Sequence, residues 1–519
     1  MLKEFRNEPL TDFSDPATVK AFRAALDTVK SWAGTTYPIV IGGEAIETGQ
    51  TFTSTNPARP NEVLGTFAKG TREVAEKAIE VASKAFETWR FVDPFERARY
   101  LLVAGEEMRR RKHEFSAIMV LEAGKSWVEA DADTAETIDF LEYYARQMMR
   151  LTEARKQLVP YPPEELDLQY IPLGVGLVIP PWNFPGAIMG GMTSASVVSG
   201  NATILKPASA TPLIAYKFCE LLWDQGLPPG VLNYLPGPGG AIGDTLVDHP
   251  KTRFIAFTGS KEVGLRIHER AAKAQPGQLW IKRTILEMGG KDAVVVDASA
   301  DLDAAAQGIV TSAFGFQGQK CSAGSRAIIV DAVYDDMVKK IVARAEKLTV
   351  GATDAGPEVY MGPVIDKSAM ETILNYIDIG KGEGELVLGG RKIDTPEGGY
   401  FVEPTIFVDV PRDARIAQEE IFGPVLAVIK AKDFDDALDI ANGTEYGLTG
   451  AVYSGNRAHL EKARREFHVG NLYFNRKCTG ALVGVHPFGG FNMSGTDSKA
   501  GGPDYLLLFT QAKSIGDKL

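Results

Sequence analysis

Short apolar segments alternate with amphipathic helical segments along most of this chain, and this alternation constrains the fold more than any other feature. Segments typical of buried parallel strands lie at residues 174–179, 202–205, 293–296, 327–330, 425–429 and 450–453. Strands that alternate with helices in this way form doubly wound sheets. We therefore predict an α/β protein with two such domains, which meet near Glu287.

Helical patterns dominate the part of the chain before the first of these strands. Residues 73–91, 94–112 and 134–150 are expected to be helices, the first with an apolar alanine and valine face. The proline-rich run at 158–165 ends this helical region, and we expect a hairpin-like excursion there.

Cys321 is the candidate nucleophile among three cysteines. It lies in a stretch of glycine and polar residues, 314–324, where a thiol is accessible. Cys219 lies in an apolar helical run and is expected in a core, and Cys478 lies in a loop-like stretch as a bystander. Spacing alone does not decide between a catalytic and a structural role for Cys321.

Glu287 is the candidate base. It ends a predicted strand and precedes a Gly289-Gly290 turn, so its carboxylate can face a cleft and activate a water. The alternative is a solvated carboxylate in a turn, which is the commonest place for glutamate.

Several motifs together resemble the aldehyde dehydrogenase superfamily. The paired signatures are Glu287-Met288-Gly289-Gly290-Lys291 and Gly318-Gln319-Lys320-Cys321. Further blocks similar to that family, in its order, are Pro181-Trp182-Asn183-Phe184-Pro185, Leu205-Lys206-Pro207, Phe257-Thr258-Gly259-Ser260, Glu420-Ile421-Phe422-Gly423-Pro424 and Pro487-Phe488-Gly489-Gly490. So many ordered blocks, over residues 180 to 490, exclude chance similarity.

The resemblance implies the aldehyde dehydrogenase fold, with two doubly wound parallel-sheet domains and a β-hairpin oligomerisation arm. The implied ranges are an N-terminal helical extension at 1–37, an NAD-binding Rossmann-like domain at 38–154 and 174–286, an arm and tail at 155–173 and 499–519, and a catalytic domain at 287–498.

The resemblance also implies the chemistry. The Cys321 thiolate would attack an aldehyde to form a thiohemiacetal, whose oxyanion would accept from the Asn183 amide and the Cys321 backbone N–H. Hydride transfer to a nicotinamide would leave a thioester, and Glu287 would activate the water that hydrolyses it. Lys320 would favour the thiolate only if its side chain turned toward Cys321.

NAD is the cofactor that the resemblance implies. Its candidate ligands are Ile179, Pro181, Trp182, Lys206, Ser209, Gly239, Gly259, Ser260, Glu420 and Phe422. Lys206 and Glu420 would bind the two riboses, and the helix after Ser260 would face the pyrophosphate. Gly237–Gly243 resembles a displaced G-x-G-x-x-G motif, and a turn before a helix explains it nearly as well.

Ser209 bears on the choice between NAD and NADP. NAD-selective relatives often carry a glutamate here, which repels a 2′-phosphate, whereas Ser209 is neutral and leaves NADP tolerated. A role for Ser209 as a helix N-cap is compatible with this interpretation.

Within the superfamily, the chain resembles the branch that oxidises L-glutamate γ-semialdehyde, in equilibrium with 1-pyrroline-5-carboxylate, in the second step of proline catabolism. The similar segments are 5–9, 315–323, 473–476 and 479–484. Ser322 and the backbone N–H groups of Gly480 and Ala481 form a candidate clamp for the substrate carboxylate. Phe184 and Phe488 would flank the aliphatic part of the substrate. The alternative for Gly480-Ala481 is a plain tight loop.

Composition excludes several other classes of protein. A net charge of −11 argues against nucleic-acid binding, and no apolar run approaches the length of a membrane span. The charged N-terminus lacks a signal-peptide pattern, and three cysteines suit a reducing cytoplasm. No metal-binding motif is present, so no metal site is predicted.

Subunit association is expected, because the hairpin-like segment and the tail at 504–510 carry apolar residues with no evident partner. In the family such an arm reaches a partner subunit, which predicts a homodimer or an assembly of dimers. Two other functions remain open: an aldehyde dehydrogenase for another semialdehyde, and a non-catalytic structural protein like the lens crystallins of this superfamily.

Overall fold

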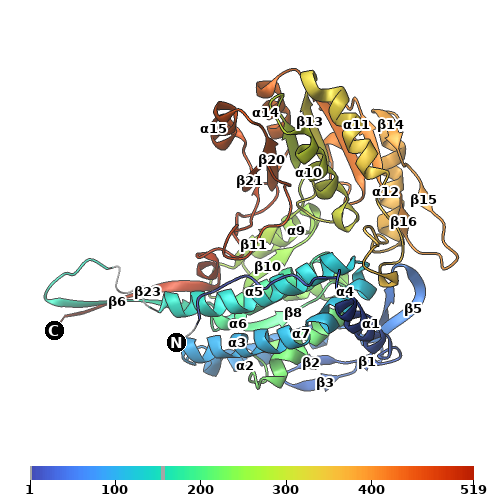
Figure 1. The fold of residues 1–519 in the computed structure, drawn as a ribbon. Coiled ribbons are helices and arrows are strands. Elements are labelled where there is room, and N and C mark those ends of the chain that lie inside the picture. The colour runs from blue at the N-terminus through green and yellow to red at the C-terminus, as the bar shows by residue number, and fades with distance from the viewer. Residues whose placement is uncertain (1–2, 153–157, 519) are drawn as a thin grey trace.

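Two seven-stranded sheets dominate the fold, each covered by helices on both faces (Figure 1). The computed structural model describes residues 3–152 and 158–518. The predicted α/β class with two doubly wound sheets is confirmed.

The first sheet comes from the N-terminal half of the chain. Its order is β11 (Arg283–Glu287), β10 (Thr252–Thr258), β7 (Val175–Ile179), β8 (Ala202–Leu205), β9 (Leu232–Tyr234), β2 (Ile39–Ile41) and β3 (Glu44–Ile46). The strands from β11 to β9 are parallel, and β2 and β3 continue the sheet in antiparallel pairings. Because helices cover both faces of a parallel sheet, its strands are apolar on both sides.

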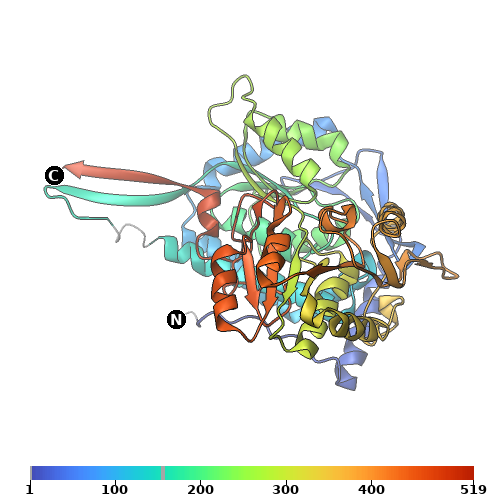
Figure 2. The same cartoon turned by 90° about the horizontal axis from the view of Figure 1, so that it is seen from above.

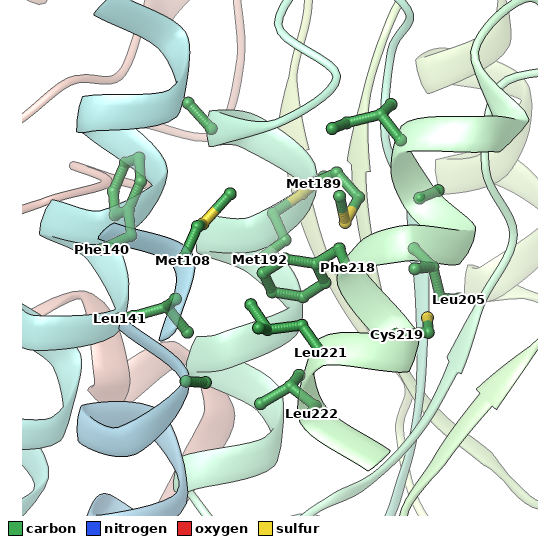
Figure 3. Close-up of a cluster of buried hydrophobic side chains, with 14 of the residues drawn as sticks. Met108, Phe140, Leu141, Met189, Met192, Leu205, Phe218, Cys219, Leu221 and Leu222 are labelled. Carbon is green, nitrogen blue, oxygen red and sulfur yellow. The ribbon is translucent and has the colours of Figure 1, made fainter. Parts of the chain in front are cut away.

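Helices pack on the two faces of this sheet and form two cores. One face contacts α2 (Arg72–Trp89), α8 (Gly239–Asp248) and α9 (Lys261–Ala272). The other contacts α3 (Pro94–Arg110), α5 (Trp127–Leu151), α6 (Ala187–Val198) and α7 (Pro212–Asp224). In this second core Phe218 of α7 lies near Met192 of α6, and Cys219 points toward Leu205 of β8 (Figure 3). Cys219 is fully buried, so its predicted core position is confirmed.

The second sheet comes from the C-terminal half. Its order is β14 (Glu385–Leu388), β17 (Thr405–Val408), β18 (Val425–Ala431), β13 (Arg326–Val330), β12 (Ala293–Val296), β20 (Thr449–Tyr453) and β21 (Asn471–Phe474), and all but β14 are parallel. One face packs on α10 (Leu302–Phe314) and α11 (Tyr334–Ala345). The other packs on α12 (Lys367–Gly380), α14 (Phe434–Asn442) and α15 (Arg457–Glu466).

The remaining elements are short or lie outside these layers. They are α1 (Pro16–Lys30), α4 (Lys112–Ala123), α13 (Arg415–Gln418), the sheet β1 (Thr36–Tyr37), β5 (Arg59–Ala68) and β4 (Thr51–Asn56), and the pairs β15 (Lys392–Ile393) with β16 (Phe401–Val402) and β19 (Tyr446–Gly447) with β22 (Phe491–Asn492). Among the helices of the described residues, none is long and apolar enough to cross a membrane.

Helix α5 is longer than its sequence pattern predicts. It begins at Trp127 instead of residue 134, with the Ser126 hydroxyl accepting from the Glu129 amide at the N-terminus. Asp131 and Asp133 are buried in its first turns, so carboxylates occupy positions where an apolar pattern is expected. Because these buried positions carry charged residues, the start of the helix lacks the apolar periodicity by which a helix is predicted from sequence.

A two-stranded arm projects from the body (Figures 1 and 2). It consists of β6 (Glu164–Pro172) and the C-terminal strand β23 (Thr510–Lys518), paired antiparallel along their whole length. The arm is therefore closed by strands from distant parts of the chain instead of by one local hairpin. Residues 155–157 of the predicted arm lie outside the described residues.

The apolar tail at 504–510, expected to serve subunit association, packs within its own subunit instead. The 3₁₀ helix η5 (Tyr505–Phe509) buries Tyr505, Leu506 and Phe509 in the second core, which contains Phe218 and Cys219, and the Phe509 ring centroid lies 5.4 Å from that of Phe254. The body of the same subunit therefore covers these side chains. Only the strand that follows them extends into the arm.

Candidate active site

The candidate catalytic residues lie where the carboxyl ends of the first sheet face the amino ends of the second. Glu287 is the last residue of β11, and residues 288–292 carry the chain directly into β12. Cys321 and Glu420 precede β13 and β18, so both come from the amino ends of the second sheet. Ligands of open α/β sheets bind outside the carboxyl ends of the strands, which is the edge where Glu287 lies.

Glu287 is buried and held by three hydrogen bonds. Its Oε1 accepts from the Ser498 hydroxyl at 2.7 Å and the Ser498 amide at 3.1 Å, and its Oε2 accepts from the Gly490 amide at 3.1 Å. Burial raises the pKa of Glu287 to about 7, although these hydrogen bonds lower it. A carboxyl with a pKa near neutrality can take and return a proton, as a general base requires.

Cys321 lies in a tight turn after α10 and is partly exposed. The preceding residues Phe316 and Gln317 have φ of 49° and 56°, and the Gln317 amide donates to the carbonyls of Gly124 (3.0 Å) and Pro363 (2.8 Å). Non-glycine residues adopt positive φ only when their surroundings hold them there. The nucleophile turn is therefore rigidly anchored.

Asn183 lies next to this turn. It is buried, and its Nδ2 donates to the Gln319 carbonyl at 3.0 Å, which orients the amide beside the turn that carries Cys321. An amide nitrogen has two N–H groups, so one stays available for an oxyanion.

Lys320 is paired with Glu129 of α5. Its Nζ lies 2.6 and 2.8 Å from the two Glu129 oxygens, so the positive charge of Lys320 is paired with Glu129 instead of with the Cys321 thiolate. Burial raises the pKa of the Cys321 thiol well above its usual value, and the Asp292, Glu420 and Glu287 carboxylates raise it further. A thiol with a raised pKa has to lose its proton when the sulfur attacks a carbonyl carbon.

Lys206 directly follows β8 at the same sheet edge. It is buried, and among the described residues its only acceptor is the Pro207 carbonyl at 3.5 Å. Burial lowers its pKa to about 8. A buried ammonium without an anionic partner is costly, and hydroxyl groups of a bound ligand would relieve that cost.

Ser209 lies exposed three residues further on. The predicted N-cap role is wrong, because α7 begins at Pro212 and its N-cap is Thr211. The pyrrolidine ring at the first helical position sets the start of α7, and the chain turns through Ser209 before it.

Ile179 ends β7 at this edge and Pro181 and Trp182 follow it, and all three are partly exposed. The Trp182 ring packs edge-on against Phe422, with centroids 5.4 Å apart, and Phe422 has a φ of 59°. Trp182, which follows a strand of the first sheet, and Phe422, which precedes a strand of the second, thus pack against each other.

Glu420 contacts the Gly289-Gly290 turn. Its Oε1 accepts from the Gly290 amide at 3.0 Å, and a Cβ on Gly289 would overlap the carboxylate. Any larger residue at position 289 would displace the Glu420 carboxylate from this place. Burial raises the pKa of Glu420 to about 7.

The predicted pyrophosphate region lies at the start of α9. Ser260 is its N-cap and accepts from the Val263 amide at 3.4 Å, and Gly259 donates to the Glu287 carbonyl at 3.1 Å. Gly239 opens α8 next to open space. Both helices present free N–H groups at their N-termini.

Phe184 stands over a fully buried ion pair. Lys125 and Asp133 are 2.8 Å apart, and the Lys125 ammonium lies 3.9 Å from the Phe184 ring centroid and 4.5 Å from that of Phe316. The ammonium is attracted to both ring faces, and this holds Phe184 next to Phe316 of the nucleophile turn.

The predicted carboxylate clamp lies on two segments. Ser322 is buried, and its carbonyl accepts from the Cys478 thiol at 3.4 Å, which makes Cys478 a buried packing residue behind it. Gly480 is exposed with a φ of 79°, and the Arg476 guanidinium holds its carbonyl at 3.0 Å. Ala481 follows, partly exposed. Phe488 pairs with Ala500 through two backbone hydrogen bonds of 2.7 and 2.8 Å.

Sequence reasoning missed three residues that shape the site. Ser498 and Gly490 bind the Glu287 carboxylate but are remote from it in the chain, and no local pattern links them. Glu136 on α5 is partly buried, and burial followed by the nearby Asp133 carboxylate raises its pKa to about 8. Across the described ranges, no cluster of three or more metal-ligating side chains occurs.

A family model described as the aldehyde dehydrogenase family matches residues 45–515, nearly the whole chain. The chain belongs to the aldehyde dehydrogenase family. A relative from Geobacillus sp. (strain WCH70), described as 1-pyrroline-5-carboxylate dehydrogenase, is 61% identical over 520 residues, covering 100% of both chains.

Solved structures of aldehyde dehydrogenases agree with this. An arginine-to-alanine mutant of Thermus thermophilus 1-pyrroline-5-carboxylate dehydrogenase is 52% identical, with a TM-score of 0.98 over 100% of both chains. A 1-pyrroline-5-carboxylate dehydrogenase from Thermus with bound NAD has the same identity and coverage, with a TM-score of 0.97.

Proposed function

We propose that this enzyme oxidises L-glutamate γ-semialdehyde, in equilibrium with 1-pyrroline-5-carboxylate, to L-glutamate with NAD as cofactor. The observation that carries the proposal is full-length similarity of about 60% to relatives described as 1-pyrroline-5-carboxylate dehydrogenase. The arrangement of Cys321, Glu287 and Asn183 supports the same chemistry, since it offers a nucleophile, a base and an oxyanion donor.

Cys321 attacks the aldehyde carbon as a thiolate, and the carbonyl oxygen becomes an oxyanion. Asn183, tied to the Gln319 carbonyl, donates its second N–H to that oxygen together with the Cys321 backbone amide. Because the thiol has a raised pKa, its proton leaves as the C–S bond forms, with solvent water as the acceptor, and Glu287 stays free to act in the later hydrolysis.

NAD, when bound, accepts the hydride of the carbonyl carbon. Lys206 and Glu420 hold the ribose hydroxyls, and the N-terminus of α9 after Gly259 and Ser260 faces the pyrophosphate. The buried ammonium of Lys206, which has no carboxylate partner among the described residues, and the carboxylate of Glu420 fit such a ligand, since each would gain hydroxyl partners. Ser209, being neutral, leaves NADP tolerated.

Glu287 then takes a proton from the water that cleaves the thioester, which releases L-glutamate and frees Cys321. Ser498 and Gly490 fix the carboxylate for this step through the hydrogen bonds described above.

The substrate carboxylate binds Ser322 and the amides of Gly480 and Ala481, and Phe184 and Phe488 flank its aliphatic chain. Glu136 is our candidate to bind the α-ammonium group of the substrate. Burial raises the pKa of this carboxyl to about 8, and a nearby cation would stabilise its ionised form. The role of Ser322 is supported by its place next to Cys321 in the chain, and that of Phe184 by its ring contact with Phe316, with centroids 6.3 Å apart.

A substrate panel tests the proposal. NADH formation is followed with glutamate γ-semialdehyde, glutarate semialdehyde and butanal, and the first is expected to have much the highest kcat/KM. Equal rates with glutarate semialdehyde would favour an enzyme for another semialdehyde, and no turnover of any aldehyde would favour a structural protein.

We further propose a cytoplasmic homodimer, or an assembly of dimers, in which the arm of β6 and β23 reaches a partner. The projection of a two-stranded ladder with open edges supports this. We also propose that 38–154 and 174–286 form the NAD-binding domain and 287–498 the catalytic domain, because each supplies one large sheet. Light scattering of the protein and of a variant truncated before Thr510 tests the dimer.

A further inference from the structure

The N-terminal segment Phe5–Phe13 has no regular structure and lies along α5 as a strap. Two buried carboxylates of α5 hold it. Asp139 accepts from the Asn7 amide at 2.8 Å and the Glu8 backbone at 2.7 Å, and Asp131 accepts from the Thr11 backbone and hydroxyl at 2.7 and 2.5 Å. The strap is therefore an integral part of the body.

Among the described hydrogen bonds, Asn7 is the one strap side chain that also binds the loop after Arg476. The same Nδ2 that binds Asp139 also donates to the Val483 carbonyl at 2.9 Å. One amide group thus joins α5 to the loop that contains Gly480 and Ala481. The Phe5 ring adds to this contact, since it lies against Tyr143 and next to Gly484.

Other contacts anchor the loop after Arg476 on both sides of Gly480 and Ala481, among them the Cys478 amide, which donates to the Ser312 hydroxyl of α10 at 3.2 Å. At its start the Arg476 guanidinium binds the carbonyls of Thr479 and Gly480 at 2.7 and 3.0 Å. At its end the Gly484 amide donates to the Gly501 carbonyl at 2.8 Å. Asn7 supplies the tie to α5, the helix whose Glu129 also holds Lys320 beside the nucleophile.

We propose that Asn7 is a positioning residue for substrate selectivity: it sets the Gly480-Ala481 loop against α5, so that the loop amides meet the substrate carboxylate. This inference rests on the proposed function. An aldehyde without a carboxylate makes no use of those amides, and its oxidation does not depend on Asn7.

Asn7→Ala tests the proposal by separating two substrates. The KM for glutamate γ-semialdehyde should rise about tenfold, as expected when a hydrogen bond that places a binding loop is lost. Its kcat should change little, and kcat/KM for butanal should stay within about twofold. A role in stability alone would change both substrates alike.

Thr11→Val is the matched control, because it removes a strap hydrogen bond to Asp131 but touches no part of the loop. It should leave the preference for glutamate γ-semialdehyde unchanged. If Thr11→Val reproduced the Asn7→Ala effect, or if Asn7→Ala kept the full preference, the proposal would be overturned.

Hydrogen exchange gives a second measurement. Amides of residues 479–484 should exchange faster in Asn7→Ala than in Thr11→Val, and equal exchange would also overturn the proposal. If Asn7→Ala does not fold, Asn7→Ser is used, since its shorter side chain cannot reach both acceptors. Equal turnover of both aldehydes by the unmodified protein would instead overturn the proposed substrate.

Discussion

Ser498 donates its hydroxyl and its backbone amide to one carboxylate oxygen of Glu287, at 2.7 and 3.1 Å. Both bonds favour the ionised carboxylate, whereas burial favours the protonated one, and the balance leaves the pKa at about 7. Ser498 thereby sets the pH at which Glu287 can act as a base.

Ser498→Ala should shift the pH dependence of the reaction. Loss of the hydroxyl bond raises the pKa of Glu287 further, so less of the base form exists at about pH 7 and the rate falls there. Above about pH 9 the rate should approach that of the unmodified protein. A pH–rate profile checks this, with Ser494→Ala as control, since that hydroxyl binds the Gly447 amide instead. An unshifted profile would contradict the role.

Glu287→Gln should separate the two halves of the reaction. The thioester is expected to form but to hydrolyse slowly, because the amide cannot take a proton from water. Rapid mixing should show a burst of NADH followed by a slow phase. Absence of the burst would mean that Glu287 is needed earlier, for the Cys321 proton.

Glu287→Gln should also change stability with pH. The folded pKa of about 7 lies above the unfolded value of 4.5, so burial of Glu287 costs nothing below pH 4.5. The cost grows as pH rises from 4.5 to 7 and is fully present above pH 7. The free energy of unfolding of the variant should therefore exceed that of the unmodified protein at about pH 8, and not at about pH 4. Denaturant unfolding at both pH values measures it.

Cys321→Ala should abolish aldehyde oxidation and leave NAD binding intact, because only the nucleophile is lost. NAD affinity is measured by fluorescence titration. Cys219→Ala, in the core of the first sheet, should keep its activity. Turnover in Cys321→Ala would exclude the covalent mechanism.

Lys206→Met should weaken NAD binding and stabilise the protein at about pH 7. The folded pKa of about 8, below the unfolded 10.5, means that burying the charge costs up to ~3 kcal/mol, and that this cost disappears as pH rises from 8 to 10.5. Thermal unfolding and NAD titration test both effects. Lys282→Met is the control, because burial also lowers the pKa of Lys282 to about 8. The Lys282 ammonium binds the Val247 carbonyl, away from the candidate NAD site, so this variant should keep its NAD affinity.

Ser322→Ala should lower kcat/KM for glutamate γ-semialdehyde about tenfold and leave butanal unchanged, because one donor to the substrate carboxylate is lost. Steady-state kinetics with both aldehydes measure the ratio. Gly480→Pro is a less clean test, since proline cannot adopt a φ of 79°. An unchanged ratio in Ser322→Ala would exclude Ser322 from the clamp.

The sequence by itself determined the local elements and the order of the motifs. Strands β8 and β12 have the predicted bounds, because four consecutive buried apolar residues identify a strand that is covered on both faces. The family motifs likewise occupy short continuous segments, so they can be recognised without knowing what packs against them.

Only the tertiary structure decided which groups act on one another. Ser498 lies 211 residues after Glu287, and Val483 lies 476 residues after Asn7, so no local pattern joins either pair. Lys320 is paired with Glu129, and Ser209 caps no helix, although neighbours in the chain suggested other roles. The physical reason is that hydrogen bonds and pKa values depend on burial and on contacts across the fold, which form only when the two sheets and α5 pack together.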